Sequence, residues 1–139
     1  MKKHIDILYM GRKQVAADAL LQLLKIDCLR VIGVLTDHHL KGSSTTSVAE
    51  QNNVPVLNHS EVEQALTSGS LSYDLGLSML YWRKLQTVFI NTPRLGNINF
   101  HPAPLPQYKG TAGYNMAIMD EMESWGATAH YMDENIDTG

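Results

Sequence analysis

The sequence contains a single cysteine, Cys28, among its 139 residues. One thiol excludes an internal disulfide, and it excludes a zinc site built from several thiolates of the same chain. Long apolar runs are absent as well. The amino-terminal run at residues 5–10 is interrupted by Asp6 and is too short for a signal sequence or a membrane span. We therefore expect a cytoplasmic protein that makes no membrane contact.

Charge of one sign is not in excess. The 11 Lys and Arg residues stand against 14 Asp and Glu residues, which gives a formal net charge of −3. A nucleic-acid backbone requires a concentrated basic surface, so we expect no general nucleic-acid binding. Glycine is scarce where the first strand ends, because the turn MGRKQ contains only Gly11. That turn is too poor in glycine for a dinucleotide-binding fingerprint.

Apolar segments and segments with helical spacing alternate along the chain, whose length suits one domain over residues 1–139. The pattern predicts strands at 5–10, 29–36, 54–57, 75–80, 97–100 and 128–132, and helices at 12–25, 47–53, 60–67, 82–90 and 113–121. Ser60 is expected to cap the third helix with Glu63 as its capping-box partner, and residues 37–46 to form a loop. This alternation predicts an α/β fold with a mostly parallel sheet and helices on both faces.

Polar side chains and prolines occur together in the segment NINFHPAPLPQYKG at residues 97–110. Asn99 and His101 are two residues apart, so on a strand both project from one face at its carboxyl end, where open parallel sheets bind ligands. An amide beside a titratable imidazole can stabilise a developing oxyanion. A structural role, in which Asn99 caps a turn and His101 bonds a carbonyl, fits the same spacing.

A carboxylate follows in the tail DENIDTG at residues 133–139. If the chain brings Asp137 close to His101, the carboxylate favours the protonated imidazole and can accept a proton through water. A solvated turn aspartate is the ordinary alternative. His130, on the last predicted strand, is interpreted as a structural histidine.

Four motifs, in this order and spacing, resemble the formyltransferase family: NFHPAPLPQYKG (99–110), AIMDE (117–121), WGATAH (125–130) and DENIDTG (133–139). That family includes the glycinamide ribonucleotide, methionyl-tRNA and sugar-nucleotide formyltransferases, which all use N10-formyltetrahydrofolate. The specific match covers residues 99–139, and the amino-terminal half is compatible with the family's Rossmann-like domain. The resemblance therefore implies a Rossmann-like fold and N10-formyltetrahydrofolate as cofactor.

The resemblance also implies catalytic roles. The family's Asn-x-His matches Asn99 and His101, and its later catalytic aspartate matches Asp137. The family's mechanism, applied to these positions, implies that a substrate amine attacks the formyl carbon while Asn99 and protonated His101 stabilise the oxyanion. Asp137 keeps the histidine charged and assists proton transfer through water, with no metal and no covalent enzyme intermediate.

Binding residues follow from the same resemblance. The residues expected to bind the cofactor are Ser78, Met79, Leu80, Tyr81, Trp82, Asp133, Glu134, Asn135 and Ile136. Taken without the resemblance, residues 79–82 would be interpreted as packing residues. Lys109 and Gly110 match the family's basic residue and glycine after the proline run, and they are expected to place the substrate.

The motif NFHPAPLP, followed by GTAGYN at residues 110–115, looks closer to the sugar-nucleotide branch. The expected acceptor is therefore a small-molecule amine, with an amino sugar on a nucleotide carrier favoured. The alternatives are a methionyl-tRNA or glycinamide ribonucleotide formyltransferase, a formyltetrahydrofolate hydrolase, and a folate-binding domain without turnover. Family members continue past the Asp-Thr-Gly turn, so the chain is also expected to be truncated at its carboxyl end.

Overall fold

The computed structural model describes residues 4–37, 40, 42–103, 105, 116 and 118–135. This part of the chain forms one six-stranded sheet in the order β3-β2-β1-β4-β5-β6. The strands are β1 (Ile5–Gly11), β2 (Leu29–Leu35), β3 (Val56–Leu57), β4 (Leu75–Met79), β5 (Asn97–His101) and β6 (Thr128–Tyr131). The first five strands pair in parallel, and β6 runs antiparallel to β5. The predicted mostly parallel sheet is confirmed.

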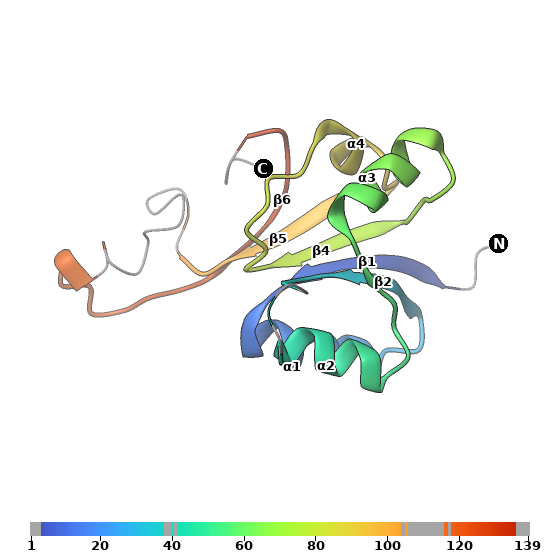
Figure 1. The fold of residues 1–139 in the computed structure, drawn as a ribbon. Helices are drawn as coiled ribbons and strands as arrows, with labels where there is room; N and C mark the ends of the chain where they lie inside the picture. The colour runs from blue at the N-terminus through green and yellow to red at the C-terminus, as the bar shows by residue number, and fades with distance from the viewer. Residues whose placement is uncertain are drawn as a thin grey trace.

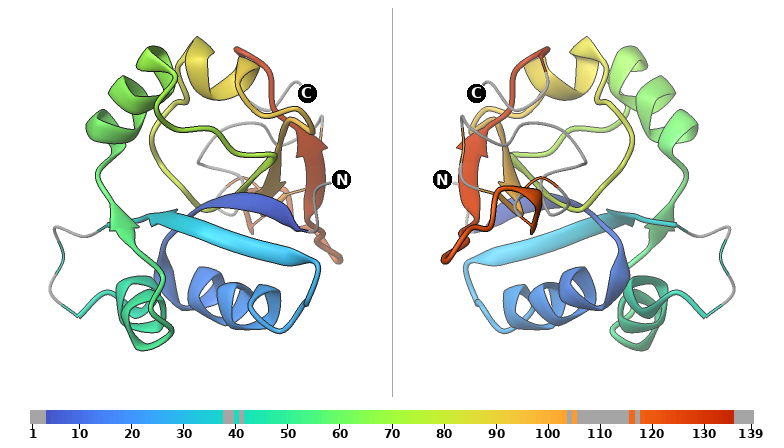
Figure 2. Two further views of the ribbon diagram at one scale, coloured as in Figure 1. Left: turned by 90° about the vertical axis from the view of Figure 1, so that its right-hand side faces the viewer. Right: turned by 90° about the vertical axis from the view of Figure 1, so that its left-hand side faces the viewer.

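Helices cover both faces of the sheet, as predicted (Figures 1 and 2). Helices α1 (Lys13–Leu23) and α2 (Ser44–Gln51) lie on one face, and α3 (His59–Ser68) and α4 (Thr87–Asn91) lie on the other. Each face of the sheet has its own hydrophobic core, and β1 contributes side chains to both. Ile7 and Tyr9 pack toward α1, whereas Leu8 and Met10 pack with α3 and α4. Among the described helices, none is long and apolar enough to cross a membrane.

The predicted cap of α3 is wrong. Asn58, not Ser60, precedes the helix, and its Oδ1 accepts hydrogen bonds from the backbone N–H groups of Ser60 (3.0 Å) and Glu61 (3.2 Å). Asparagine is as good an N-cap as serine, and it comes two residues earlier, so it satisfies the orphan amides first. The helix consequently begins at His59, a residue that the sequence had not placed in any element.

Two other helix boundaries differ from the prediction. Helix α2 begins at Ser44, inside the predicted loop, because the Ser43 side chain accepts the N–H of Thr46 and caps it. The helix predicted at 82–90 is wrong in its first half, since α4 begins only at Thr87 after the extended residue Gln86. Of the helix predicted at 113–121, Met116, Ile118 and Met119 are helical, the chain turns at Asp120 and Glu121, and the other residues lie outside the described part of the chain.

Gly76 of β4 and Asn97 of β5 are paired across the sheet and hold these strands in register. Asn97 is 1% exposed; its Nδ2 donates to the Phe89 carbonyl (2.8 Å) and its Oδ1 accepts from the Tyr73 hydroxyl (3.0 Å). A Cβ on residue 76 would overlap Asn97 Oδ1. Glycine therefore provides the space in which this buried amide sits.

Replacing Gly76 with alanine tests this pairing. We expect Gly76→Ala to lower the free energy of unfolding by about 2–3 kcal/mol, because the methyl group displaces a buried, hydrogen-bonded amide. Gly126→Ala is the matched control, since nothing lies within 4 Å of a Cβ at that position. It should stay within about 0.5 kcal/mol of the parent. Equal urea midpoints for the two variants would contradict this account.

Candidate functional site

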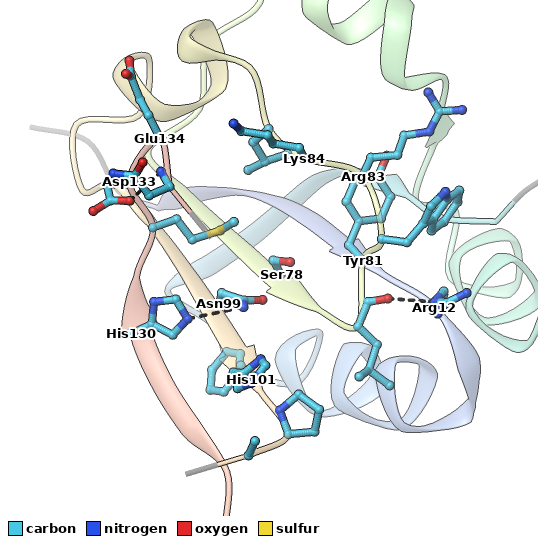
Figure 3. A pocket seen from close by; sticks show the side chains of 18 of the residues that line it. Arg12, Ser78, Tyr81, Arg83, Lys84, Asn99, His101, His130, Asp133 and Glu134 are labelled. Carbon is cyan, nitrogen blue, oxygen red and sulfur yellow. Dashed lines mark hydrogen bonds between the residues drawn. The ribbon is translucent and has the colours of Figure 1, made fainter. Parts of the chain in front are cut away.

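A cavity of about 360 Å³ opens at the carboxyl ends of β1, β4 and β5 (Figure 3). Its walls come from the turn between β1 and α1, the end of β4 with the following loop, the end of β5, and the chain that leaves β6. The sheet order reverses between β1 and β4, and this switch point is where open α/β sheets form a crevice. The volume is in the range of small-molecule sites.

Three side chains form a row on the cavity floor. Strand register pairs Ser78 of β4 with Asn99 of β5, and Asn99 with His130 of β6. Partners across strands point to the same face, and His101 lies two residues beyond Asn99 on that face. The predicted common face of Asn99 and His101 is therefore confirmed, and both line the cavity. His101 is only 6% exposed.

His130 orients Asn99, as the dashed line between them in Figure 3 shows. His130 Nδ1 lies 3.0 Å from the Tyr131 carbonyl oxygen, which can only accept, so Nδ1 carries the proton. Nε2 is then left to accept from Asn99 Nδ2 at 3.4 Å. Because the amide group is planar, this contact also fixes the direction of the other N–H of Asn99 Nδ2. His130 lies on a strand and has hydrogen-bond partners, as the sequence interpretation expected, and it also lines the cavity.

The chain that leaves β5 is held against the chain that enters β6. Trp125 Nε1 donates to the Pro102 carbonyl (2.7 Å), and Thr128 Oγ1 donates to the Ala103 carbonyl (2.8 Å). Thr128 Oγ1 also accepts the N–H of Leu105 (3.1 Å). These contacts explain the tryptophan and threonine of the WGATAH motif, because they support the segment that follows His101.

The loop after β4 forms one wall and starts in a strained conformation. Leu80 has φ 58°, a left-handed value that costs energy in a residue with a side chain. Arg12, which directly follows β1, holds this residue in place: its Nε donates to the Leu80 carbonyl at 2.9 Å, and its guanidinium lies over the Trp82 ring, 5.6 Å from the centroid. Arg83 lies 5.8 Å from the same ring. These contacts fix the beginning of the loop.

Most of the expected cofactor-binding residues meet in this cavity. Those that line it are Ser78, Leu80, Tyr81, Trp82, Asp133, Glu134 and Asn135. Met79 does not; it packs with the core on the α1 face of the sheet. Ile136, the catalytic candidate Asp137, and the substrate candidates Lys109 and Gly110 lie outside the described residues.

Four cations border the cavity, and no motif had predicted them: Arg12, Lys13, Arg83 and Lys84. Within the described part of the chain none of them forms an ion pair with a carboxylate. Burial raises the pKa of Tyr81 to about 12, although nearby Arg83 acts in the opposite direction. The Tyr81 hydroxyl is therefore protonated at neutral pH. Asp133 and Glu134 also line the cavity, so the four cations exceed the carboxylates and the border favours an anionic ligand.

Comparison with known proteins identifies the family. A model of the formyl transferase family matches residues 7–139. The chain is 31% identical over 148 residues to the methionyl-tRNA formyltransferase of Bacteroides thetaiotaomicron, an alignment that covers 99% of this chain and 46% of that protein. The chain belongs to the formyl transferase family, as its motifs indicated, and it spans about half the length of the curated relatives it matches.

Solved structures agree on the architecture. Phosphoribosylglycinamide formyltransferase from Bacillus halodurans superposes with a TM-score of 0.76 at 22% identity, over 96% of this chain and 75% of that one. WlaRD, a sugar 3N-formyl transferase solved in the presence of dTDP and 5-N-formyl-THF, gives a TM-score of 0.75 at 21% identity, over 99% and 50% of the two chains. At these identities the likeness shows the fold, and the predicted Rossmann-like architecture is confirmed.

Thr128 offers a test of how the segment after His101 is held. Thr128→Val removes the hydroxyl that joins the Ala103 carbonyl to the Leu105 amide and should lower the free energy of unfolding by about 1–3 kcal/mol. Thr128→Ser keeps the hydroxyl and should recover most of that loss. Denaturant unfolding compares them, and a valine variant as stable as the serine variant would refute the proposed support.

Proposed function

We propose that this chain transfers a formyl group from N10-formyltetrahydrofolate to a primary amine. One observation carries the proposal: in a chain of the formyl transferase family, Asn99 and His101 lie on one face at the floor of one small-molecule cavity. The expected alternative, in which these two side chains only cap a turn and bond a carbonyl, does not account for the cavity above them.

The residues present fit the proposed donor. Leu80, Tyr81 and Trp82 form a largely apolar and aromatic wall, suited to a flat heterocycle. Cations such as Arg83 at the border suit the carboxylates of a folate's glutamate. When bound, N10-formyltetrahydrofolate supplies a formyl group on nitrogen that an amine can attack.

In the proposed mechanism the protein stabilises charge on the formyl oxygen. Asn99 Nδ2, oriented by His130, donates one hydrogen bond to that oxygen, and the imidazolium of His101 donates another. Both donors lie on β5, which is paired with a neighbouring strand on each side, so little reorganisation accompanies charge development. We assign to Asp137 the support of the charged His101 and the removal of the amine proton through water. A proton would reach N10 as the bond between the formyl carbon and N10 breaks, so that tetrahydrofolate leaves and the formylated amine remains.

For the acceptor we propose a small-molecule amine, with an amino sugar on a nucleotide carrier first. The motif NFHPAPLP and the segment GTAGYN at 110–115 support this choice. Lys109 and Gly110, which follow the proline run, are proposed to place that substrate.

Methionyl-tRNA is the second candidate acceptor, because curated relatives at 28–32% identity are methionyl-tRNA formyltransferases. A direct assay separates the two candidates: purified protein is given N10-formyltetrahydrofolate with either an amino-sugar nucleotide or methionyl-tRNA. Formate release without any amine would instead indicate a hydrolase. Donor binding with neither product would indicate a folate-binding domain without turnover.

Alanine substitutions test the two catalytic candidates. Asn99→Ala and His101→Ala should each lower kcat by about 10²–10³-fold, because each removes a donor to the charged oxygen. Asn91→Ala, at the exposed end of α4, serves as the control and should leave kcat unchanged. If Asn99→Ala turned over as fast as this control, the proposed role of the amide would be wrong.

The cations at the border yield a separate prediction for binding. Arg83→Gln should weaken the affinity for 5-formyltetrahydrofolate by about five- to ten-fold and reduce its salt dependence, since one charge that attracts the carboxylates is lost. Lys25→Gln removes an exposed charge away from the cavity and provides the comparison. Calorimetric titration at two salt concentrations measures both. Identical affinities for the two variants would exclude Arg83 from ligand attraction.

A further inference from the structure

His59 lies behind the cavity wall, and none of the roles described so far uses it. It is the first residue of α3, on a different element from every residue that lines the cavity, and it is 5% exposed. A buried imidazole keeps its place only when its ring nitrogens have partners. The identity of those partners shows what His59 does.

Both ring nitrogens bond to the loop that forms the cavity wall. His59 Nε2 lies 3.0 Å from Gln86 Oε1, and Nδ1 lies 2.7 Å from the Tyr81 hydroxyl. Because a carboxamide oxygen only accepts, Nε2 donates to Gln86, and Nδ1 shares the second hydrogen bond with the Tyr81 hydroxyl. One imidazole therefore connects residues near the two ends of the loop between β4 and α4.

The imidazole itself has a fixed orientation. Its ring stacks on Phe89 of α4, with 4.9 Å between ring centroids and 29° between ring planes. Phe89 is fully buried in the core between the sheet and the helices α3 and α4. The His59 ring thus packs on a fully buried side chain, while its two nitrogens bond to the loop.

The loop needs such support because it begins in a strained conformation and contains no regular structure. Leu80 is left-handed, and the chain from there to Gln86 forms neither helix nor strand. Arg12 holds the loop at the Leu80 carbonyl, which faces the turn after β1. His59 holds it at Tyr81 and Gln86. Tyr81 connects His59 with the cavity, since its ring lines the cavity while its hydroxyl bonds to His59.

We propose that His59 is a positioning residue for ligand binding: through the Tyr81 hydroxyl and Gln86 it keeps the loop at residues 80–86 in the shape that closes the cavity wall. It acts on affinity for the ligand in the cavity and not on the chemical step, because Asn99 and His101 stand on β5. Only the identity of that ligand rests on the proposed function.

The first experiment needs no ligand. His59→Phe keeps an aromatic ring against Phe89 and removes both hydrogen bonds, whereas Tyr81→Phe removes only the hydroxyl. Amide hydrogen exchange of the full chain should be at least about five-fold faster in His59→Phe at Phe89 and Ile90, whose N–H groups bond to the Gln86 carbonyl at the end of the loop, with α1 unchanged. His4→Phe, a histidine at the opposite end of the sheet, is the control. Unchanged exchange at these two amides would overturn the inference.

The second experiment measures steady-state formyl transfer. His59→Phe should raise the KM for N10-formyltetrahydrofolate by about ten-fold and change kcat by less than about two-fold. In the His59→Phe background, Tyr81→Phe should add less than about two-fold, because both substitutions break the same contact. A merely structural histidine would lower the unfolding midpoint and leave KM unchanged, which would refute the proposal. If the parent protein transfers no formyl group, the proposed function fails, and the exchange experiment alone decides the role of His59.

Discussion

The candidate site depends on the register of β5 between β4 and β6. A shift by one residue would turn Asn99 and His101 to the α1 face, because alternate residues of a strand point to opposite faces. The buried amide of Asn97 opposes this shift, since it fits only over Gly76 and bonds to groups on the α4 side. Two residues farther along the same strand, the same register places Asn99 beside Ser78 and His130. A packing constraint in the core thus aligns the proposed catalytic donors.

Floor and wall of the cavity are supported by different physical means. The floor is a row of side chains on three paired strands, whose backbone hydrogen bonds resist displacement (Figure 3). The wall is an irregular loop, held at Leu80 by Arg12 and at Tyr81 by His59. Since the floor carries the proposed chemistry and the wall the proposed ligand contact, substitutions in the two should affect different kinetic constants.

Local pattern was sufficient to predict most of the sheet and the pair Asn99 and His101, because a strand's period of two is a property of neighbouring residues. It was not sufficient for His130 or His59, which reach the site through strand register and through helix packing. Leu85 and Phe89 are both buried and are four residues apart, which is helical spacing. The chain is nevertheless extended at Gln86 between them, so the predicted helix began too early. Met79 was included with its neighbours although its side chain turns to the other face.

The central claim is that the cavity at the carboxyl edge of the sheet binds a folate. Isothermal titration of the protein with 5-formyltetrahydrofolate, a stable analogue of the proposed donor, tests it most directly. We expect one site with micromolar affinity, and NMR resonance shifts on binding that are confined to the loop at 80–86, the end of β5 and residues 130–135. A folded protein that shows no binding at millimolar ligand, or that binds with shifts elsewhere, would contradict it.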